Sequence, residues 1–542
     1  MNKKILIIFA FTHFLFPHLL HAQDSLKTNV FNVEKTLKPI LSEAIKIQSN
    51  PNPEVPEIKS PTFDYTKIPD GRHNASPTIY AIRPLSMGTS LLPKLKNNYT
   101  ILGYGNLNSP LFETYLSTGR SKELQAGIFL KHFSSNPNNN AFSNNTIDAF
   151  VKKFSTNGVL ESDVKYFRNN IYLYGLPDNV SQTASPDRQL FQTFALKGSY
   201  SNIVKDSNEL AYKIGLSNNY FFDNNNIGEN TFKLYADIGK RIQGNMLEVK
   251  SELVISDIKY SGVDFQRTIF DFDPRYTLEM EKMYLELGFN SCVSVDTSEA
   301  TIPNIFPVAE VGYTIIEKKI VAFAGITGNE NYHTYQDIAN ENPFIHRFDF
   351  RKTRTNFEVY GGVKGKLSPQ TSFILQAGWS SVQNLLFYAV DSGSHYTQRV
   401  IYDTSNAGVT HLKAELSHEF NSDFRFTFTI NYYKYNLQLA QPFSRPTLET
   451  KLNVMYNIGD KFILRADIFT MNERHALVYG SATTTDVTLK GLVDLNAGID
   501  YLYNKNIAVF LNFNNLTNNL YQRWYAYPVY GFTLLGGLKV TF

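Results

Sequence analysis

Residues 532 to 542 read Phe532-Thr533-Leu534-Leu535-Gly536-Gly537-Leu538-Lys539-Val540-Thr541-Phe542. The even positions are apolar apart from one glycine, and four of the five odd positions are Thr, Gly or Lys. Because successive side chains of a β-strand point to opposite faces, this stretch is predicted to be a strand with one apolar face. In a chain that also carries an export signal, such a strand favours a closed transmembrane barrel, since a sheet in lipid must have no open edge. We therefore expect an all-β, antiparallel outer-membrane barrel, with Phe542 as its assembly signal.

The first 22 residues have the composition of a secretory signal peptide. Lys3 and Lys4 supply the positive head, Ile5 to Phe16 the apolar middle, and Leu20-His21-Ala22 a small-residue cleavage site. A membrane-anchoring helix is the alternative, but Pro17 interrupts an apolar run that is already shorter than the roughly 18 residues a span needs. Residues 1–22 are therefore expected to direct export.

Residues 23–97 form a separate, proline-rich region that lacks the strand alternation of the rest of the chain. Such a stretch is expected to stay extended, although Val33 to Ile47 has apolar residues at helical spacing and predicts one short helix. One interpretation is a periplasmic tether. The other is a segment that docks on outer-membrane or periplasmic proteins, or that folds into the barrel mouth. The prolines are Pro51, Pro53, Pro56, Pro61, Pro69, Pro77, Pro84 and Pro93.

The composition excludes several classes of protein. After the signal, none of the 542 residues form another apolar run long enough for a spanning helix, whereas 33 Tyr and 41 Phe suit strands and interfacial girdles. The 52 basic residues nearly balance the 49 acidic ones, so no nucleic-acid partner is implied. The single cysteine, Cys292, is expected to be a packed small residue.

From residue 98 to residue 542 the pattern predicts the barrel itself, with about 22 strands. In 424–436, for example, Phe426 and Phe428 alternate with Arg425 and Thr427. A charge that faces lipid is costly, so the polar rows are expected to line a wet, charged lumen. The lumen-lining candidates are Glu248, Lys250, Glu252, Lys413, Glu415, Arg425, Arg465, Asp467, Asp494 and Asp500.

The lengths of the links between strands predict the orientation. Short links, such as Gln243-Gly244 and Asn504-Lys505, belong on the periplasmic side, and long ones belong outside. Tyr335, Ile338 and Ala339 predict a short helix in one long link, ended at Asn342-Pro343. The predicted long links include Asn329 to Phe350, Gln383 to Ser405 and Asn472 to Asp486.

The C-terminal motifs resemble those of a known family. The runs Asp494-Leu495-Asn496-Ala497-Gly498-Ile499, Phe510-Leu511-Asn512-Phe513-Asn514-Asn515-Leu516-Thr517-Asn518 and Tyr521-Gln522-Arg523-Trp524-Tyr525 look like the barrel signature of TonB-dependent receptors, especially those of the Bacteroidota. The resemblance implies a barrel of this strand number that binds a solute or takes it up across the outer membrane. The family carries a folded plug before its barrel, and no recognisable plug stands in residues 23–97.

No catalytic or metal-binding pattern accompanies these features. The sequence has no Gly-rich phosphate loop, no nucleophile elbow and no His/Cys/carboxylate cluster at metal spacing, so neither an enzyme nor a cofactor is expected. Asp223 to Glu229 is too short for an EF-hand calcium loop and is interpreted as a solvated turn, as are Asp337 and Glu341. The expected partner is the outer-membrane lipid. Two functions stay open: a solute receptor, or a structural or accessory subunit of an outer-membrane assembly or secretion complex.

Overall fold

The computed structural model describes residues 98–119, 123–137, 140–176, 186–206, 208–260, 263–297, 302–347, 349–393, 395–420, 423–480 and 483–542. The predicted signal peptide, the proline-rich region and its helix at Val33 to Ile47 lie outside these residues and stay predictions.

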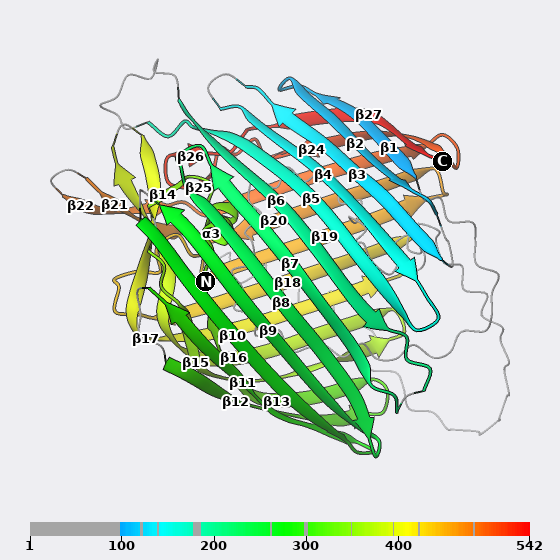
Figure 1. Cartoon of the computed structure of the whole chain (residues 1–542). Helices are drawn as coiled ribbons and strands as arrows, with labels where there is room; N and C mark the ends of the chain where they lie inside the picture. Colours follow the sequence, from blue (N-terminus) through cyan, green and yellow to red (C-terminus); the bar gives the residue numbers. More distant parts are fainter. Residues whose placement is uncertain are drawn as a thin grey trace, which may run out of the picture. The chain divides into compact units, whose positions relative to one another are not determined.

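Twenty-two strands form one closed antiparallel barrel (Figure 1). They are β1 (Tyr99–Gly105), β2 (Ser109–Ser117), β3 (Leu124–Ser135), β4 (Phe142–Phe154), β5 (Gly158–Leu173), β6 (Asp187–Asn202), β7 (Ala211–Asp223), β8 (Gly228–Ile242), β9 (Asn245–Tyr260), β10 (Val263–Glu279), β11 (Met283–Asp296), β12 (Ile302–Ile316), β13 (Ile320–Asn331), β15 (Thr353–Ser368), β16 (Thr371–Ser392), β17 (Tyr396–Glu419), β18 (Phe424–Asn436), β19 (Leu448–Ile458), β20 (Phe462–Met471), β23 (Leu492–Leu502), β24 (Ile507–Asn514) and β27 (Thr533–Thr541). The predicted strand number is confirmed.

The barrel closes where its first strand meets its last. β1 pairs antiparallel with β27 from Tyr99 opposite Thr541 to Gly105 opposite Leu535, and Figure 1 shows the blue and red strands side by side. Because every strand then has a neighbour on both sides, the barrel leaves no unpaired edge to lipid.

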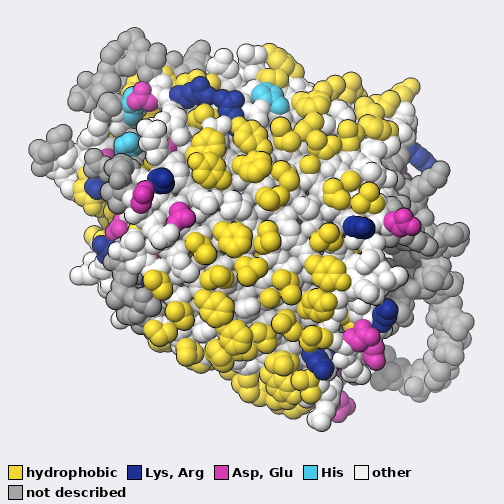
Figure 2. All heavy atoms as spheres, viewed as in Figure 1, with side chains coloured by type: hydrophobic (Ala, Val, Ile, Leu, Met, Phe, Trp, Pro, Cys, Tyr) yellow, Lys and Arg dark blue, Asp and Glu magenta, His cyan; other side chains and the backbone are white. Residues whose placement is uncertain are grey.

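One face of each strand is apolar and points outward. On β1 the exposed side chains are Leu102 and Tyr104, and on β27 they are Leu538 and Val540. Figure 2 shows hydrophobic side chains spread over the visible face of the barrel. The alternation that predicted strands thus also sorts apolar groups to the outer surface, as a membrane requires.

The links between strands are short at one end of the barrel. The hairpin from β8 to β9 turns through Gln243 and Gly244, both with positive φ (52° and 89°), which a glycine adopts without steric cost. At the other end the links include 332–352, 437–447, 472–491 and 515–532. By the rule that outer-membrane barrels have short periplasmic turns, we assign the long links to the outside.

Five short strands and one helix lie in the long links. They are β14 (Ile345–Arg347), β21 (Arg474–Tyr479), β22 (Thr484–Leu489), β25 (Gln522–Trp524), β26 (Tyr527–Pro528) and α3 (Tyr335–Glu341). The predicted helix is confirmed. It begins after Thr334, whose side chain accepts from the backbone of Asp337 while the Asp337 carboxylate accepts from the Thr334 N–H. It ends at Asn342, which precedes a proline and has extended backbone.

The predicted long link from Gln383 to Ser405 is wrong. β16 and β17 run through it as strands of 22 and 24 residues, joined by a tight turn. The tip of this hairpin is buried on both faces, so its side chains do not alternate, and the sequence lacks the period that identified the other strands. The predicted link from Asn472 likewise contains β21 and most of β22.

These tips build a small sheet of their own outside the barrel wall. β14 pairs in parallel with β17, and β21 pairs in parallel with β16 and antiparallel with β22. The strand order is therefore β14-β17-β16-β21-β22, and we call this set the outer sheet. Among the described residues, no helix is both long and apolar enough to cross a membrane.

Candidate functional site

The long links fold together into a cap at one end of the barrel. Its parts are residues 332–352, which we call the crossbar, residues 437–447, residues 515–532 and the outer sheet. They share one buried hydrophobic cluster with the barrel wall. This cluster comprises Phe191, Phe221, Ile227, Tyr335, Ile338, Ala339, Ile345, Leu386, Tyr388, Val400, Trp524 and Tyr527.

The crossbar reaches across the barrel. It links β13 to β15, yet α3 packs against β6, β7 and β8, and four strands (β9 to β12) lie between β8 and β13. The hydroxyl of Tyr335 donates to Asp223 Oδ2 at 2.8 Å, and the backbone N–H of Gln336 donates to Glu229 Oε2 at 3.0 Å. The Gln336 amide also donates to Thr193 Oγ1 at 3.2 Å. These contacts fix the helix on the opposite wall.

Burial and the nearby Asp223 carboxylate both raise the pKa of the Tyr335 phenol well above its usual value. The hydroxyl therefore keeps its proton and remains a donor to Asp223 across the whole physiological pH range. Asp223 and Glu229 are themselves buried in the wall, and the crossbar supplies them with neutral donors. The interpretation of Asp223 to Glu229 as a solvated turn is therefore wrong.

A second set of contacts holds the crossbar to the other links. Arg445, in the link from β18 to β19, donates to Glu341 Oε1 at 2.6 Å, and the Tyr388 hydroxyl donates to Glu341 Oε2 at 2.8 Å. The rings of Phe344 and Tyr527 stack with centroids 3.5 Å apart. The interpretation of Glu341 as a solvated carboxylate is wrong too, since its side chain is only 10% exposed. Asp337 serves as a helix-capping group.

The two ends of the crossbar are anchored by buried charges. Glu330, at the end of β13, accepts from Arg354 at 3.0 Å and lies 3.6 Å from the Lys352 ammonium. The same ammonium lies 3.7 Å from Asp296, which is also 3.4 Å from Arg267. Charges this deeply buried need a partner, and each is part of the same network.

The outer sheet gives the cap a second core. Residues 385–390 of β16 are all buried. Leu386 and Tyr388 join the cluster around the crossbar, whereas Leu385 and Phe387 pack on the other face with Phe443 of the link from β18 to β19. The β16 tip is thus enclosed between two apolar layers.

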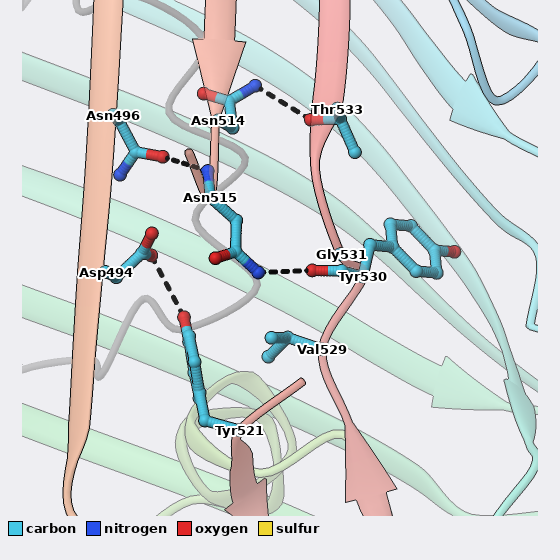
Figure 3. A pocket seen from close by; sticks show the side chains of 9 residues that line it. All are labelled: Asp494, Asn496, Asn514, Asn515, Tyr521, Val529, Tyr530, Gly531 and Thr533. Carbon is cyan, nitrogen blue, oxygen red and sulfur yellow. Dashed lines mark hydrogen bonds between the residues drawn. The ribbon is translucent and has the colours of Figure 1, made fainter. Parts of the chain in front are cut away.

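The motif around Asn515 has a structural role. The Asn515 amide donates to the carbonyls of Asn519 and Tyr530, both at 2.8 Å, and its Oδ1 accepts from the Asn519 N–H and the Thr517 hydroxyl, both at 3.0 Å. Figure 3 shows the small pocket beside it, where the Tyr521 hydroxyl donates to Asp494. The polar groups around the pocket largely bond one another, so the motif positions residues 515–532 for the cap.

Replacing Asn515 by alanine is expected to loosen this link. The residue has a φ of +48°, which Asn tolerates better than Ala, and its buried side chain makes four hydrogen bonds. We expect a cost of about 2 to 4 kcal/mol to the local fold. Limited proteolysis should cut the variant within residues 515–532 much faster than the parent. Asn226→Ala, at an exposed position with a φ of +62°, is the control, and equal cleavage of both variants would contradict the assignment.

The ten lumen candidates lie on the strand faces opposite the exposed apolar residues. Asp500 accepts from Arg465 at 2.6 and 2.8 Å and from Lys539 at 3.0 Å. Lys413 lies 3.7 Å from Glu415. Arg425 contacts the Met455 sulfur at 3.2 Å. The first two candidate pairs are thus brought together, along with Lys539, which the sequence did not single out.

The other candidates are spread around the wall. Glu252 pairs with Lys233 at 2.9 Å, and the Tyr332 hydroxyl of the crossbar donates to it at 3.4 Å. The remaining contacts are these: Lys250 stands directly opposite Asp273 and Asp237, Glu248 opposite Arg275, Asp467 accepts from the Asn453 amide, and Asp494 accepts from Tyr521. The wall is therefore lined by paired charges and not by one concentrated site.

Two single residues complete the comparison with the sequence predictions. Cys292 is buried beside Val254 and Ile269, which confirms it as a packed small residue. Phe542 is exposed, and its N–H donates to the Asn98 carbonyl at 2.9 Å; its role in assembly stays a prediction. Within the described ranges, no group of three or more His, Cys, Asp or Glu residues is arranged to hold a metal ion.

Comparison with known proteins identifies the class of fold. No protein-family model and no curated protein matches this chain. Among solved structures, the FrpB iron transporter from Neisseria meningitidis is similar with a TM-score of 0.66 and 10% identity, covering 82% of each chain. The pyoverdine receptor FpvA from Pseudomonas aeruginosa gives 0.65 and 12%, over 82% of this chain and 78% of that one. The ferric-catecholate import receptor Fiu from E. coli gives 0.64 and 10%, over 84% and 83%.

These similarities, with the closed barrel, define the fold as that of TonB-dependent receptor barrels. It is the architecture of proteins that span the bacterial outer membrane. The expected fold class is confirmed.

Proposed function

We propose that this protein is an outer-membrane receptor that binds a solute at its capped end and takes it up through the barrel. The observation that carries the proposal is the closed 22-strand barrel, which is similar over more than four-fifths of the chain to barrels of solved iron-transport receptors. A barrel of this size encloses a lumen wide enough for a solute of siderophore size. The paired charges at Glu248, Lys250, Glu252, Lys413, Glu415, Arg425, Arg465, Asp467, Asp494 and Asp500 would line the route.

The solute class follows from the similar receptors. Their names record ferripyoverdine, ferric catecholate and iron as what they carry. We propose a ferric chelate for this protein as well. We also propose a receptor of the Bacteroidota type, in which residues 1–22 are a signal peptide and residues 23–97 form a proline-rich periplasmic extension without a plug fold.

The two tryptophans provide a direct test of solute binding. Trp524 lies in the cap, where it is 4% exposed against Tyr388, whereas Trp379 is on the outer face. In a Trp379→Phe variant, Trp524 is the single tryptophan of the chain. Titration with ferric enterobactin or ferripyoverdine is expected to quench its fluorescence saturably, because bound iron near the cap absorbs the emitted energy.

The matched control is Trp524→Phe, which reports only from Trp379 and should show no saturable change. Absence of saturable quenching by either ferric chelate in folded Trp379→Phe protein would count against a receptor for this solute class.

A second candidate function is a structural or accessory subunit of an outer-membrane assembly or secretion complex. The folded cap favours it, since the described links cover the mouth with two hydrophobic cores. In that case, gentle extraction of outer membranes should recover other outer-membrane proteins in fixed ratio. Deleting residues 23–97 should abolish this recovery if that region grips the partner.

A further inference from the structure

The crossbar is the segment of the cap that spans the barrel from one wall to the other. Its ends are held at β13 and β15 by Glu330 and Lys352, while α3 rests on β6 to β8 through Tyr335 and Gln336. It also lies beneath the stacked ring of Tyr527 and the guanidinium of Arg445. The other parts of the cap thus meet on it.

We propose that the crossbar is the gate of the outer mouth: while α3 is docked on β6 to β8 the barrel does not conduct, and release of α3 opens it. The proposal goes beyond solute uptake, since it applies equally to a receptor and to an accessory subunit.

The contacts make docking an all-or-none event. α3 has seven residues, a length at which a helix is stable only through tertiary packing. Three of its residues, Tyr335, Ile338 and Ala339, are buried in the shared cluster, so undocking exposes them together and removes the support of the helix. The segment therefore has two states, docked and folded or released and unfolded.

The wall side of the contact is suited to both states. The crossbar contacts Asp223, Glu229 and Thr193 through hydrogen bonds from a hydroxyl, a backbone N–H and an amide. No cation of the crossbar pairs with these two carboxylates in the printed contacts, so water entering the released gate can hydrate them without breaking an ion pair. A ligand or partner that competes for these groups would favour the released state.

The gate is tested by single-channel recording of the purified full chain in planar lipid bilayers. The parent is expected to show no steady current. Replacing residues 335–341 by a seven-residue Gly/Ser segment should give large, steady current steps. A milder variant, Tyr335→Phe with Gln336→Ala, keeps the backbone and should give brief openings. Unheated gel mobility verifies that each variant retains a folded barrel.

Cross-linking supplies the reverse experiment. In a Cys292→Ser background that also carries Glu341→Ala, cysteines are placed at Thr193 and Gln336, whose side chains are in contact at 3.2 Å. Joining them with a short bismaleimide should return the openings of this variant to the closed baseline, and the same reagent should have no effect on a variant with only one of the two cysteines.

Two variants separate the gate from other ways of closing the barrel. Lys413→Gln changes a wall charge that has no printed contact with the cap and should leave the barrel closed. Deleting residues 23–97 should also leave it closed. The proposal is overturned if the parent already conducts, if the folded Gly/Ser variant stays closed, or if the deletion of 23–97 alone opens the barrel.

Discussion

Replacing Gly537 by alanine is expected to prevent most of the protein from forming a closed barrel. Gly537 lies in β27, opposite Gly103 of β1 on one side and Phe510 of β24 on the other. A Cβ added there would lie 2.0 Å from the Leu102 carbonyl oxygen and 2.7 Å from the Phe510 ring. Overpacking of this kind typically costs about 1 to 3 kcal/mol, and here a backbone atom blocks the space, so we expect the upper end or more.

The fraction of protein with folded mobility on an unheated gel, after refolding into detergent, measures this effect. Gly198→Ala is the matched control, because the added Cβ would lie 4.0 Å from its nearest neighbour, the Glu161 carbonyl oxygen. Gly198 lies in β6, far from the seam where the first and last strands meet. If both variants fold to the same fraction, the seam does not depend on this glycine.

Replacing Asp500 by alanine should produce the second large loss of stability. Its carboxylate holds the Arg465 guanidinium and the Lys539 ammonium, and all three side chains are at most 14% exposed. The three residues lie on β20, β23 and β27, so the cluster ties together neighbouring strands next to the seam. Without the carboxylate two like charges remain buried together, a situation that costs about 3 to 5 kcal/mol.

The temperature at which the folded band disappears on gels reports this loss. Asp500→Asn keeps two polar atoms and should fall between the parent and Asp500→Ala. Glu415→Ala removes the carboxylate of a half-exposed pair, whose contribution is about 0 to 1 kcal/mol, and serves as the control. An unchanged temperature for Asp500→Ala would mean that water already neutralises the cluster.

The strands were predictable because the signal for each of them is local. A strand such as 424–436 must show lipid to one face and a polar interior to the other, so its own sequence carries the alternation. The tip of β16 does not follow this rule, and it was predicted as a link. Residues 385–390 are covered on both faces by segments far away in the chain, and an apolar run without a period does not distinguish a strand from other buried structure.

The candidate site was much less predictable. The helix α3 was predicted from Tyr335, Ile338 and Ala339, but nothing near them in the sequence indicates that they pack on β6 to β8. Asp223, Glu229 and Glu341 resemble ordinary turn carboxylates in the sequence. Their partners Tyr335, Gln336 and Arg445 are separated from them by about a hundred residues, and no local pattern records such contacts.

The sequence by itself determined that the chain forms a membrane-spanning barrel, how many strands it has and which end carries the long links, because each of these depends on the local order of apolar, polar and turn residues. Only the tertiary structure decided that the long links meet as a cap, that the crossbar docks on the far wall and that Asp500 joins Arg465 to Lys539. Those features depend on which strands become neighbours once the barrel closes, and the distances between residues across a lumen are set by closure and not by position along the chain.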